Sequence, residues 1–150
     1  MVQLTTMEQL DQDLAKSMKA GDATRTGVLR LLRSSLKNEQ IKYGHELSEA
    51  EVLKVLQREA KQRRDSITAY NDANRPELAK EEEVELGIIA DYLPEALSDE
   101  ELSKLVDEVI AELGNPGPAA MGQVIGAIMA KAGARAEGGA VSKVVREKLV

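Results

Sequence analysis

The sequence has no cysteine, no tryptophan and no phenylalanine, and its 150 residues include only three tyrosines and one histidine. The lack of cysteine excludes disulfide scaffolds, thiolate zinc sites, iron–sulfur clusters and cysteine nucleophiles. The scarcity of aromatic side chains argues against a protein that holds single strands of nucleic acid by stacking their bases. A chain of this length can still bury enough apolar surface to fold without disulfides or a structural metal. We therefore expect one domain or two small ones.

Long apolar runs are also missing. No stretch approaches the roughly 18 consecutive apolar residues of a membrane-spanning helix, and residues 1–6 lack a basic and then apolar leader. We therefore expect a soluble protein in the cytoplasm that has no contact with membranes.

The residues show no catalytic constellation. The single histidine, His45, follows a helix-ending glycine in an expected loop, and the Ser34–Lys37 segment has a Ser-x-x-Lys spacing without its companion motifs. The glycines of 133–139 lack the lysine of a phosphate-binding loop, and the acidic side chains of 81–85 point in different directions on a helix. We therefore expect no catalytic residue, no metal site and no cofactor.

Helix signals recur along the whole chain. Three boxes of the form Ser/Thr-x-x-Glu/Gln, formed by Thr6 with Gln9, Ser48 with Glu51, and Ser98 with Glu101, each precede apolar residues spaced by three and four. No alternating strand pattern competes with them. The sequence therefore predicts an all-α protein with helices at about 7–20, 22–43, 49–71, 76–91, 99–113, 119–132 and 140–149.

A boundary between two bodies is expected at Leu93-Pro94, because the residue before a proline is disfavoured in the α conformation. The predicted N-terminal domain, residues 1–93, has four helices, and the predicted C-terminal domain, residues 94–150, has three. Since the C-terminal body is small, we expect it to dock on the first body or to tolerate mobility.

The formal net charge is −6, but its distribution is uneven. Residues 25–64 hold 10 basic and 5 acidic side chains, whereas residues 81–150 have a net charge of −8. Arg30, Arg33 and Lys37 are spaced by three and four. Lys54, Arg58 and Lys61 of the next helix are also spaced by four and three, so each set occupies one helix face. If the two helices pack antiparallel, they form a broad basic surface. Its two interpretations are phosphate contacts to structured RNA and pairing with glutamates of the same chain.

The segment Met121–Lys131 combines small and large apolar residues on one expected helix. Gly122 and Gly126 lie on one face, where they permit another backbone to approach closely. Branched and unbranched apolar side chains between them supply a core face. Helix packing accounts for this pattern without any functional role.

Taken together, the motifs of the chain resemble the GatB/YqeY-type family. This family includes the C-terminal tail of the B subunit of glutamyl/aspartyl-tRNA amidotransferase and small free-standing proteins of about this length. The resemblance covers nearly the whole chain. It rests on Met121–Lys131, Arg135–Gly138, Tyr92–Glu95 with Leu97–Leu102, Glu59–Ser66, Arg25–Leu31 and Asn38–Ile41.

The loop after residue 132 departs from the family pattern. It usually reads Gly-Lys/Arg-Ala-Asp-Gly, whereas here Ala134 replaces the first glycine, Glu137 replaces the aspartate, and a glycine stands at Gly133. If the loop contacts RNA through that glycine, the contact is shifted or lost.

The resemblance implies a non-catalytic tRNA-binding or tRNA-amidation accessory protein, because the amidotransferase tail holds the outer body of the tRNA while other subunits perform the chemistry. The expected partners are tRNA or another structured RNA, together with amidotransferase or aminoacyl-tRNA synthetase components, and no DNA. The C-terminal body is expected to use three close-packing glycines, Gly122, Gly126 and Gly138. The candidate RNA contacts are Arg30, Arg33, Lys37, Lys61, Arg63, Arg64, Lys131, Arg135 and Lys143.

Two alternatives stay open. One is a protein-interaction adaptor without RNA binding, which uses the acidic face of residues 95–112 and the helix of Gly122 and Gly126. The other is the carbon–nitrogen ligase activity of the family's holoenzyme, with glutamine as amido donor. That activity needs an activated nucleophile and an ATP site, and the sequence shows neither.

Overall fold

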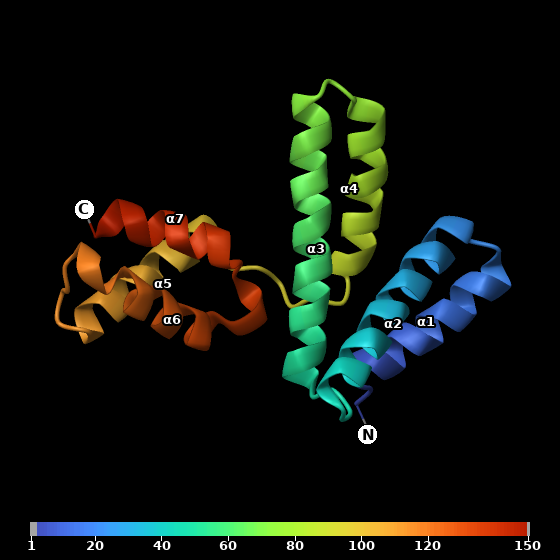
Figure 1. Ribbon diagram of the computed structural model, residues 1–150, viewed down its shortest axis with the longest axis horizontal. Coiled ribbons are helices and arrows are strands. Elements are labelled where there is room, and N and C mark those ends of the chain that lie inside the picture. The colour runs from blue at the N-terminus through green and yellow to red at the C-terminus, as the bar shows by residue number, and fades with distance from the viewer. Residues whose placement is uncertain (1–2, 150) are drawn as a thin grey trace. The chain divides into compact units, whose positions relative to one another are not determined.

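The computed structural model describes residues 3–149, and all regular elements in this range are helical, so the predicted all-α class is confirmed (Figure 1). Residues 1, 2 and 150, at the outer ends of the predicted domains 1–93 and 94–150, lie outside the described residues. The contacts divide the chain at Leu93–Pro94 into two compact units. None of the described helices has the length and apolar character needed to cross a membrane.

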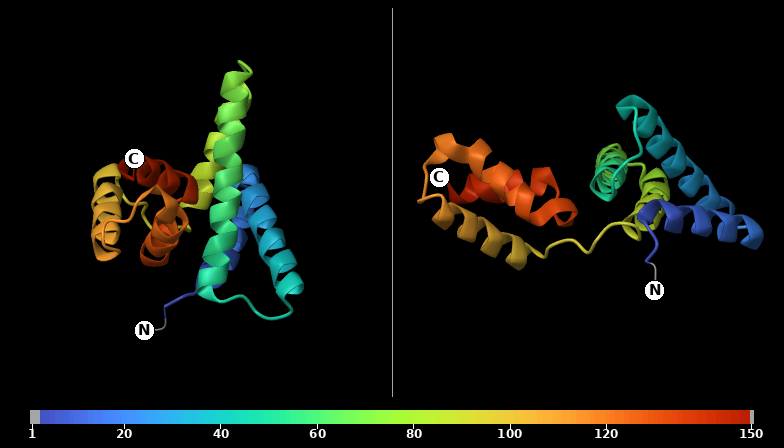
Figure 2. Two further views of the ribbon diagram at one scale, coloured as in Figure 1. Left: turned by 60° about the vertical axis from the view of Figure 1, so that its left-hand side comes forward. Right: turned by 90° about the horizontal axis from the view of Figure 1, so that it is seen from below.

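The N-terminal unit consists of two helical hairpins. The first is formed by α1 (Thr6–Ala20) and α2 (Ala23–Tyr43), and the second by α3 (Glu49–Asp72) and α4 (Pro76–Ala90). Figures 1 and 2 show the helices of each hairpin side by side. The hairpins meet along α2, which contacts both α3 and α4. This helix therefore has one face in the core and one face exposed to solvent.

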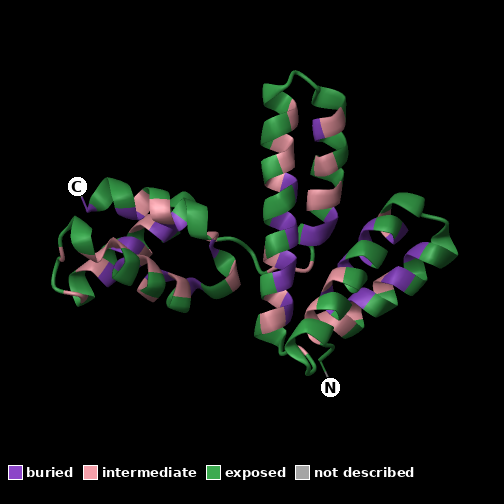
Figure 3. Ribbon diagram, viewed as in Figure 1, coloured by how far each residue is buried: buried purple, intermediate pink, exposed green. Residues whose placement is uncertain are grey.

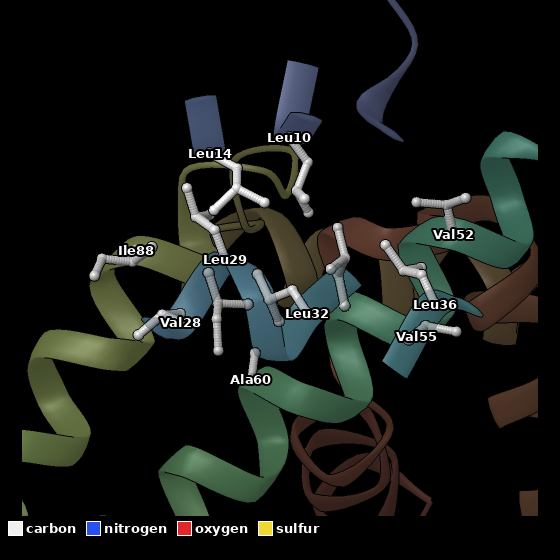
Figure 4. Packing of buried hydrophobic residues seen from close by; sticks show 12 residues of the cluster. Leu10, Leu14, Val28, Leu29, Leu32, Leu36, Val52, Val55, Ala60 and Ile88 are labelled. Atoms are coloured by element: carbon white, nitrogen blue, oxygen red, sulfur yellow. The ribbon is translucent and has the colours of Figure 1, made fainter. Parts of the chain in front are cut away.

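The core of the N-terminal unit is aliphatic. Leu29, Leu32 and Leu36 of α2 have no exposed surface, and Figure 4 shows Leu10 and Leu14 of α1 packed above this row. Side chains of α3 and α4 complete the cluster, namely Val52, Val55, Leu56, Ala60, Ile88 and Ile89. Figure 3 shows that the buried positions form stripes along the helices and leave the other faces exposed. The three-and-four spacing of apolar residues thus determines which side of each helix faces water.

Two of the three predicted capping boxes are confirmed. At the start of α3, the Ser48 hydroxyl accepts a hydrogen bond from the Glu51 backbone N–H at 3.2 Å, while the Ser48 N–H donates to the Glu51 carboxylate at 2.9 Å. Ser98 and Glu101 make the same reciprocal pair at the start of α5. The backbone hydrogen bond from each serine is the main cause that lowers the pKa of its glutamate below the usual value.

The first predicted box is wrong by one residue. Thr5, rather than Thr6, caps α1 by accepting a hydrogen bond from the Glu8 N–H at 3.2 Å. Thr6 lies inside the helix and donates from its hydroxyl and its N–H to the Glu49 carboxylate, at 2.8 and 2.9 Å. Thr5 with Glu8 and Thr6 with Gln9 have the same spacing, so the sequence alone offers both threonines as the cap. The contact of Thr6 with α3 shows that Thr5 is the cap.

The end of α4 is tied to α1 by a polar contact. The Tyr92 hydroxyl donates to the Asp13 carboxylate at 2.6 Å. Burial, and then this hydrogen bond, raise the pKa of the Tyr92 phenol above its usual value. The folded protein therefore holds this phenol in its neutral form more strongly than the unfolded chain does.

Replacing Tyr92 by phenylalanine is expected to change the alkaline stability profile. In the unfolded chain the phenol ionises near pH 10, whereas in the native protein it retains its proton to higher pH, so stability falls as the pH rises above about 10. The Tyr92→Phe variant should lose less stability across this range, as measured by denaturant unfolding at several pH values. In an absorbance titration, the variant should lack the phenolate step that occurs at the highest pH in the parent. If the variant instead lacks a step near pH 10, the raised pKa of Tyr92 is wrong.

The C-terminal unit contains α5 (Asp99–Glu112), α6 (Met121–Ala132) and α7 (Gly138–Lys148), with short 3₁₀ turns at Pro118–Ala120 and Gly133–Arg135. Each of the three helices contacts the other two. Their shared core is Leu102, Val106, Val109, Val124, Ile128, Ala132, Ala136, Val141, Val145 and Leu149. The segment before α5 is held by the turn at 133–135, because the Leu97 N–H donates to the Arg135 carbonyl at 2.8 Å.

Candidate nucleic-acid interface

The outward face of α2 is basic. The buried stripe that includes Leu29, Leu32 and Leu36 turns the opposite side of the helix to solvent. That side holds three cations and no acidic residue, and we call it the α2 basic face: Arg30, Arg33 and Lys37. The one acidic residue of α2, Glu39, is 12% exposed and accepts a hydrogen bond from Arg58 of α3 at 3.1 Å.

Most cations of the α2 basic face are available to a ligand. Among the described residues, no carboxylate lies within ion-pair distance of Arg30 or Lys37. Arg30 contacts only the Met18 sulfur, at 3.9 Å. Arg33 pairs with Asp11 of α1 at 3.0 Å, and both side chains are about half exposed. Because such an exposed pair contributes about 0–1 kcal/mol, a phosphate can compete for Arg33.

Arg63 is a predicted RNA contact that the structure buries against glutamates, so it is poorly placed to reach a phosphate. Its side chain is 9% exposed and donates to the Glu59 carboxylate at 2.6 Å. Glu59 also accepts a hydrogen bond from Ser35 of α2 at 2.8 Å, and Arg63 lies 3.6 Å from Glu85 of α4. We call these four residues the Arg63 network. The packing of α4 against α3 covers Arg63, and the network links α2, α3 and α4.

Acidic side chains surround this network on α4. Burial, and then the like charge of Glu85, raise the pKa of Glu82 above its usual value, although the nearby Arg63 opposes the change. In the part of the chain that the structure describes, no group of three or more acidic or histidine side chains is placed to hold a metal ion. This side of the unit would repel a phosphate backbone.

The remaining predicted contacts of α3 are less available than those of α2. Lys61 is exposed but pairs with Asp65 at 3.1 Å. Arg64 is partly buried and has an interaction within the chain. Where α3 meets α2, the pair of Arg58 and Glu39 neutralises one of the expected cations. The structure therefore does not continue the α2 basic face across α3.

Two of the three predicted contacts in the C-terminal unit have partners of their own. Lys131 donates to both oxygens of Glu112, at 2.9 and 2.8 Å. Arg135 donates to the Glu95 carbonyl at 3.0 Å and lies 3.6 Å from the Glu101 carboxylate, so it fastens the segment before α5. Lys143 is exposed and has no carboxylate partner among the described residues.

The predicted close packing at glycines is wrong within the C-terminal unit. A Cβ atom added at Gly122, Gly126 or Gly138 would meet nothing within 4 Å. The contacts of α6 in the unit are made from its other side, by buried residues such as Val124 and Ile128. A sequence pattern can place glycines on one helix face, but it does not show whether another backbone approaches that face.

The glycine that departs from the family loop has a structural role. Gly133 has φ 57° and ends α6, a conformation that a residue with a Cβ adopts only with strain. The Glu137 residue then precedes α7 in an extended conformation. In this chain the loop glycine therefore serves to end a helix.

Two features at the end of α2 were not predicted from the sequence. Lys42 is a further exposed cation there, and the rings of Tyr43 and His45 stack on one another. An open groove beside them is lined by residues that include Met7, Lys37 and Ile41. The helix end at Gly44 was predicted, but the orientation of the two rings on either side of it was not.

These features define a class: a small all-α protein of two helical units, with one basic helix face in the first. The chain belongs to the YqeY-like protein family, whose model matches residues 7–149. The resemblance to the GatB/YqeY-type family is thus confirmed.

Known relatives carry the name "Altered inheritance of mitochondria protein 41, mitochondrial". The protein of Lachancea thermotolerans is 33% identical over 118 residues, which cover 77% of this chain and 63% of the relative. That of Clavispora lusitaniae is 34% identical, with 71% and 64% covered, and that of Kluyveromyces lactis is 33% identical, with 79% and 66% covered. The matched region thus spans less than two thirds of each relative's own length.

The expected cytoplasmic location is contradicted by these relatives, since each of them is named as mitochondrial. The expectation rested on the absence of long apolar runs and on residues 1–6. The relatives extend beyond the region that matches this chain.

Proposed function

We propose that this protein binds structured RNA, and tRNA in particular, through the α2 basic face, as an accessory protein without chemistry of its own. The observation that carries the proposal is the combination of Arg30, Arg33 and Lys37 on a helix face without an exposed acidic residue. Membership of the YqeY-like family supports it, because the similar tail of the amidotransferase holds tRNA.

The dimensions of the face suit a phosphate backbone. From Arg30 to Lys37 the helix rises about 10 Å, because each residue adds about 1.5 Å. A row of this length reaches neighbouring phosphates of one RNA strand, and such contacts position a protein on RNA without reading its sequence. The net charge of −6 opposes attraction to polyanions in general. Binding should therefore depend on the fit of an RNA to α2.

Removing three cations from the α2 basic face should weaken tRNA binding and its salt dependence. We expect the variant with Arg30→Gln, Arg33→Gln and Lys37→Gln to bind at least about tenfold more weakly at low salt. Its slope of log affinity against log salt should be smaller by about 2–3, because each lost phosphate contact removes about 0.7–0.9. Fluorescence anisotropy with labelled tRNA across a salt series measures both quantities.

A matched control removes the same charge elsewhere in the unit. Lys16, Lys54 and Lys80 are exposed on α1, α3 and α4, and none has a carboxylate partner among the described residues. The variant with all three changed to glutamine should bind tRNA within about threefold of the parent, since it retains the α2 basic face. Equal losses in the two variants, or no saturable binding by the parent at low salt, would contradict the proposal.

A protein-interaction adaptor is the second candidate, and it is favoured by the open space at Gly122 and Gly126 of α6. Another protein's backbone could approach this face, including that of an amidotransferase or synthetase component. This candidate predicts a protein partner that co-purifies after nuclease treatment and is lost in a Gly126→Leu variant. Glutamine hydrolysis by the pure protein would instead favour the carbon–nitrogen ligase alternative.

A further inference from the structure

A preformed pair of stacked rings stands at the C-terminal end of the α2 basic face. The ring centroids of Tyr43 and His45 are 5.7 Å apart, and the ring planes differ by 10°. Gly44, between them, has φ 76° and turns the chain sharply, which brings the histidine ring over the tyrosine. Tyr43 is nevertheless 51% exposed. One side of the ring is therefore covered by His45, and much of the remainder faces solvent.

Neighbouring groups hold the histidine in this position. His45 Nδ1 is 2.7 Å from the Glu46 carbonyl, and its Nε2 is 3.8 Å from the Glu51 carboxylate. Glu51 is itself held by the capping box at Ser48. The ring pair is thus oriented before any ligand arrives, which lowers the entropic cost of binding to it.

Two cations, a carboxylate and an exposed apolar side chain line a groove together with His45. These residues are Arg33, Lys37, Glu46 and Ile41, and Ile41 is 70% exposed. Lys42 precedes Tyr43 directly. An aromatic platform next to cations is the combination that binds a base together with its own phosphates.

We propose that Tyr43 and His45 form a stacking site for one unpaired nucleobase of an RNA whose phosphates lie along the α2 basic face. This inference rests on the proposed function and adds a requirement to it: the RNA has an unpaired base near its contact with the end of α2. A blunt duplex can contact the cations with its phosphates but has no unpaired base to stack on the rings. An RNA hairpin or tRNA with an unstacked loop base can make both contacts.

Two RNA probes distinguish the stacking site from the phosphate contacts. One is a hairpin with 2-aminopurine in its loop, and the other is a blunt RNA duplex with the same number of phosphates. With the parent protein, the hairpin should bind more tightly, and the 2-aminopurine fluorescence should be quenched on binding. The Tyr43→Ala variant should bind the hairpin about tenfold more weakly without quenching, and the duplex as before. Tyr43→Phe should retain both signals.

Two further variants control for changes in folding. Tyr43→Leu keeps an apolar side chain at the helix end but cannot stack, so it should behave like the alanine variant with an unchanged circular dichroism spectrum. Tyr70→Ala removes an aromatic residue near the C-terminal end of α3, away from Tyr43, and should leave hairpin binding unchanged. If the parent binds both RNAs but Tyr43→Ala and Tyr43→Leu retain tight hairpin binding with quenching, the stacking site is wrong while the proposed function stands. If the parent binds neither RNA, both fail.

Discussion

Replacing Arg63 by alanine is expected to lower the free energy of unfolding of the N-terminal unit by about 3–5 kcal/mol, because it leaves the buried Glu59 carboxylate without its counter-charge. The side chains of Arg63 and Glu59 are 9% and 8% exposed, and their charged groups are 2.6 Å apart. In the variant, Glu59 would retain its hydrogen bond from Ser35 but lose its cation. Denaturant unfolding followed by circular dichroism measures the loss.

A neighbouring lysine and a double variant test the cause. Lys61→Ala, two residues away, removes an exposed pair with Asp65 and should cost less than about 1 kcal/mol. Arg63→Met combined with Glu59→Gln removes both buried charges and should recover a large part of the stability lost in Arg63→Ala. If Arg63→Ala is as stable as the parent but binds tRNA more weakly, the Arg63 network is wrong and the sequence-based interpretation of Arg63 is restored.

Replacing Leu32 by alanine is expected to destabilise the same unit by about 2–5 kcal/mol, through lost burial and the cavity that remains. Leu32 has no exposed surface and lies in the row of α2 leucines on which α1, α3 and α4 pack (Figure 4). A core that joins two hairpins has no single helix that can shift to close the gap. The midpoint of denaturant unfolding measures this effect.

The adjacent leucine is a matched control for this prediction. Leu31 is on the same helix but is 43% exposed, so Leu31→Ala should change stability by no more than about 0.5 kcal/mol. The two variants differ in the burial of the changed side chain and share its chemistry and its helix. Equal effects would mean that α2 is not oriented as described.

The helices were predictable because their signals are local. Capping at Ser48 and Ser98 involves residues three apart, and the left-handed ends at Gly21 and Gly44 depend on one residue each. The apolar spacing of α2 likewise predicted which face is buried, and therefore that Arg30, Arg33 and Lys37 are exposed. These inferences need no knowledge of which helices are neighbours.

The candidate site was predictable only in part, because availability of a cation depends on partners distant in sequence. Arg33 and Arg63 both looked like exposed cations. Arg33 meets an exposed aspartate of α1, whereas α4 covers Arg63 and adds Glu85, 22 residues further along the chain. The stacked rings of Tyr43 and His45 were missed for a different reason, since a predicted helix end at Gly44 does not specify how the two rings are oriented.

The sequence by itself determined the helical class, most helix ends, the absence of cysteine chemistry and the basic character of the second helix, all of which follow from composition and contacts within about four residues. Its family followed from the set of motifs and is confirmed over residues 7–149. Only the tertiary structure decided that Arg63 is buried, that Arg135 fastens a segment, and that Gly122 and Gly126 face open space. The physical reason is that burial and pairing are properties of packed helices, and the residues of one helix do not specify which neighbour covers them.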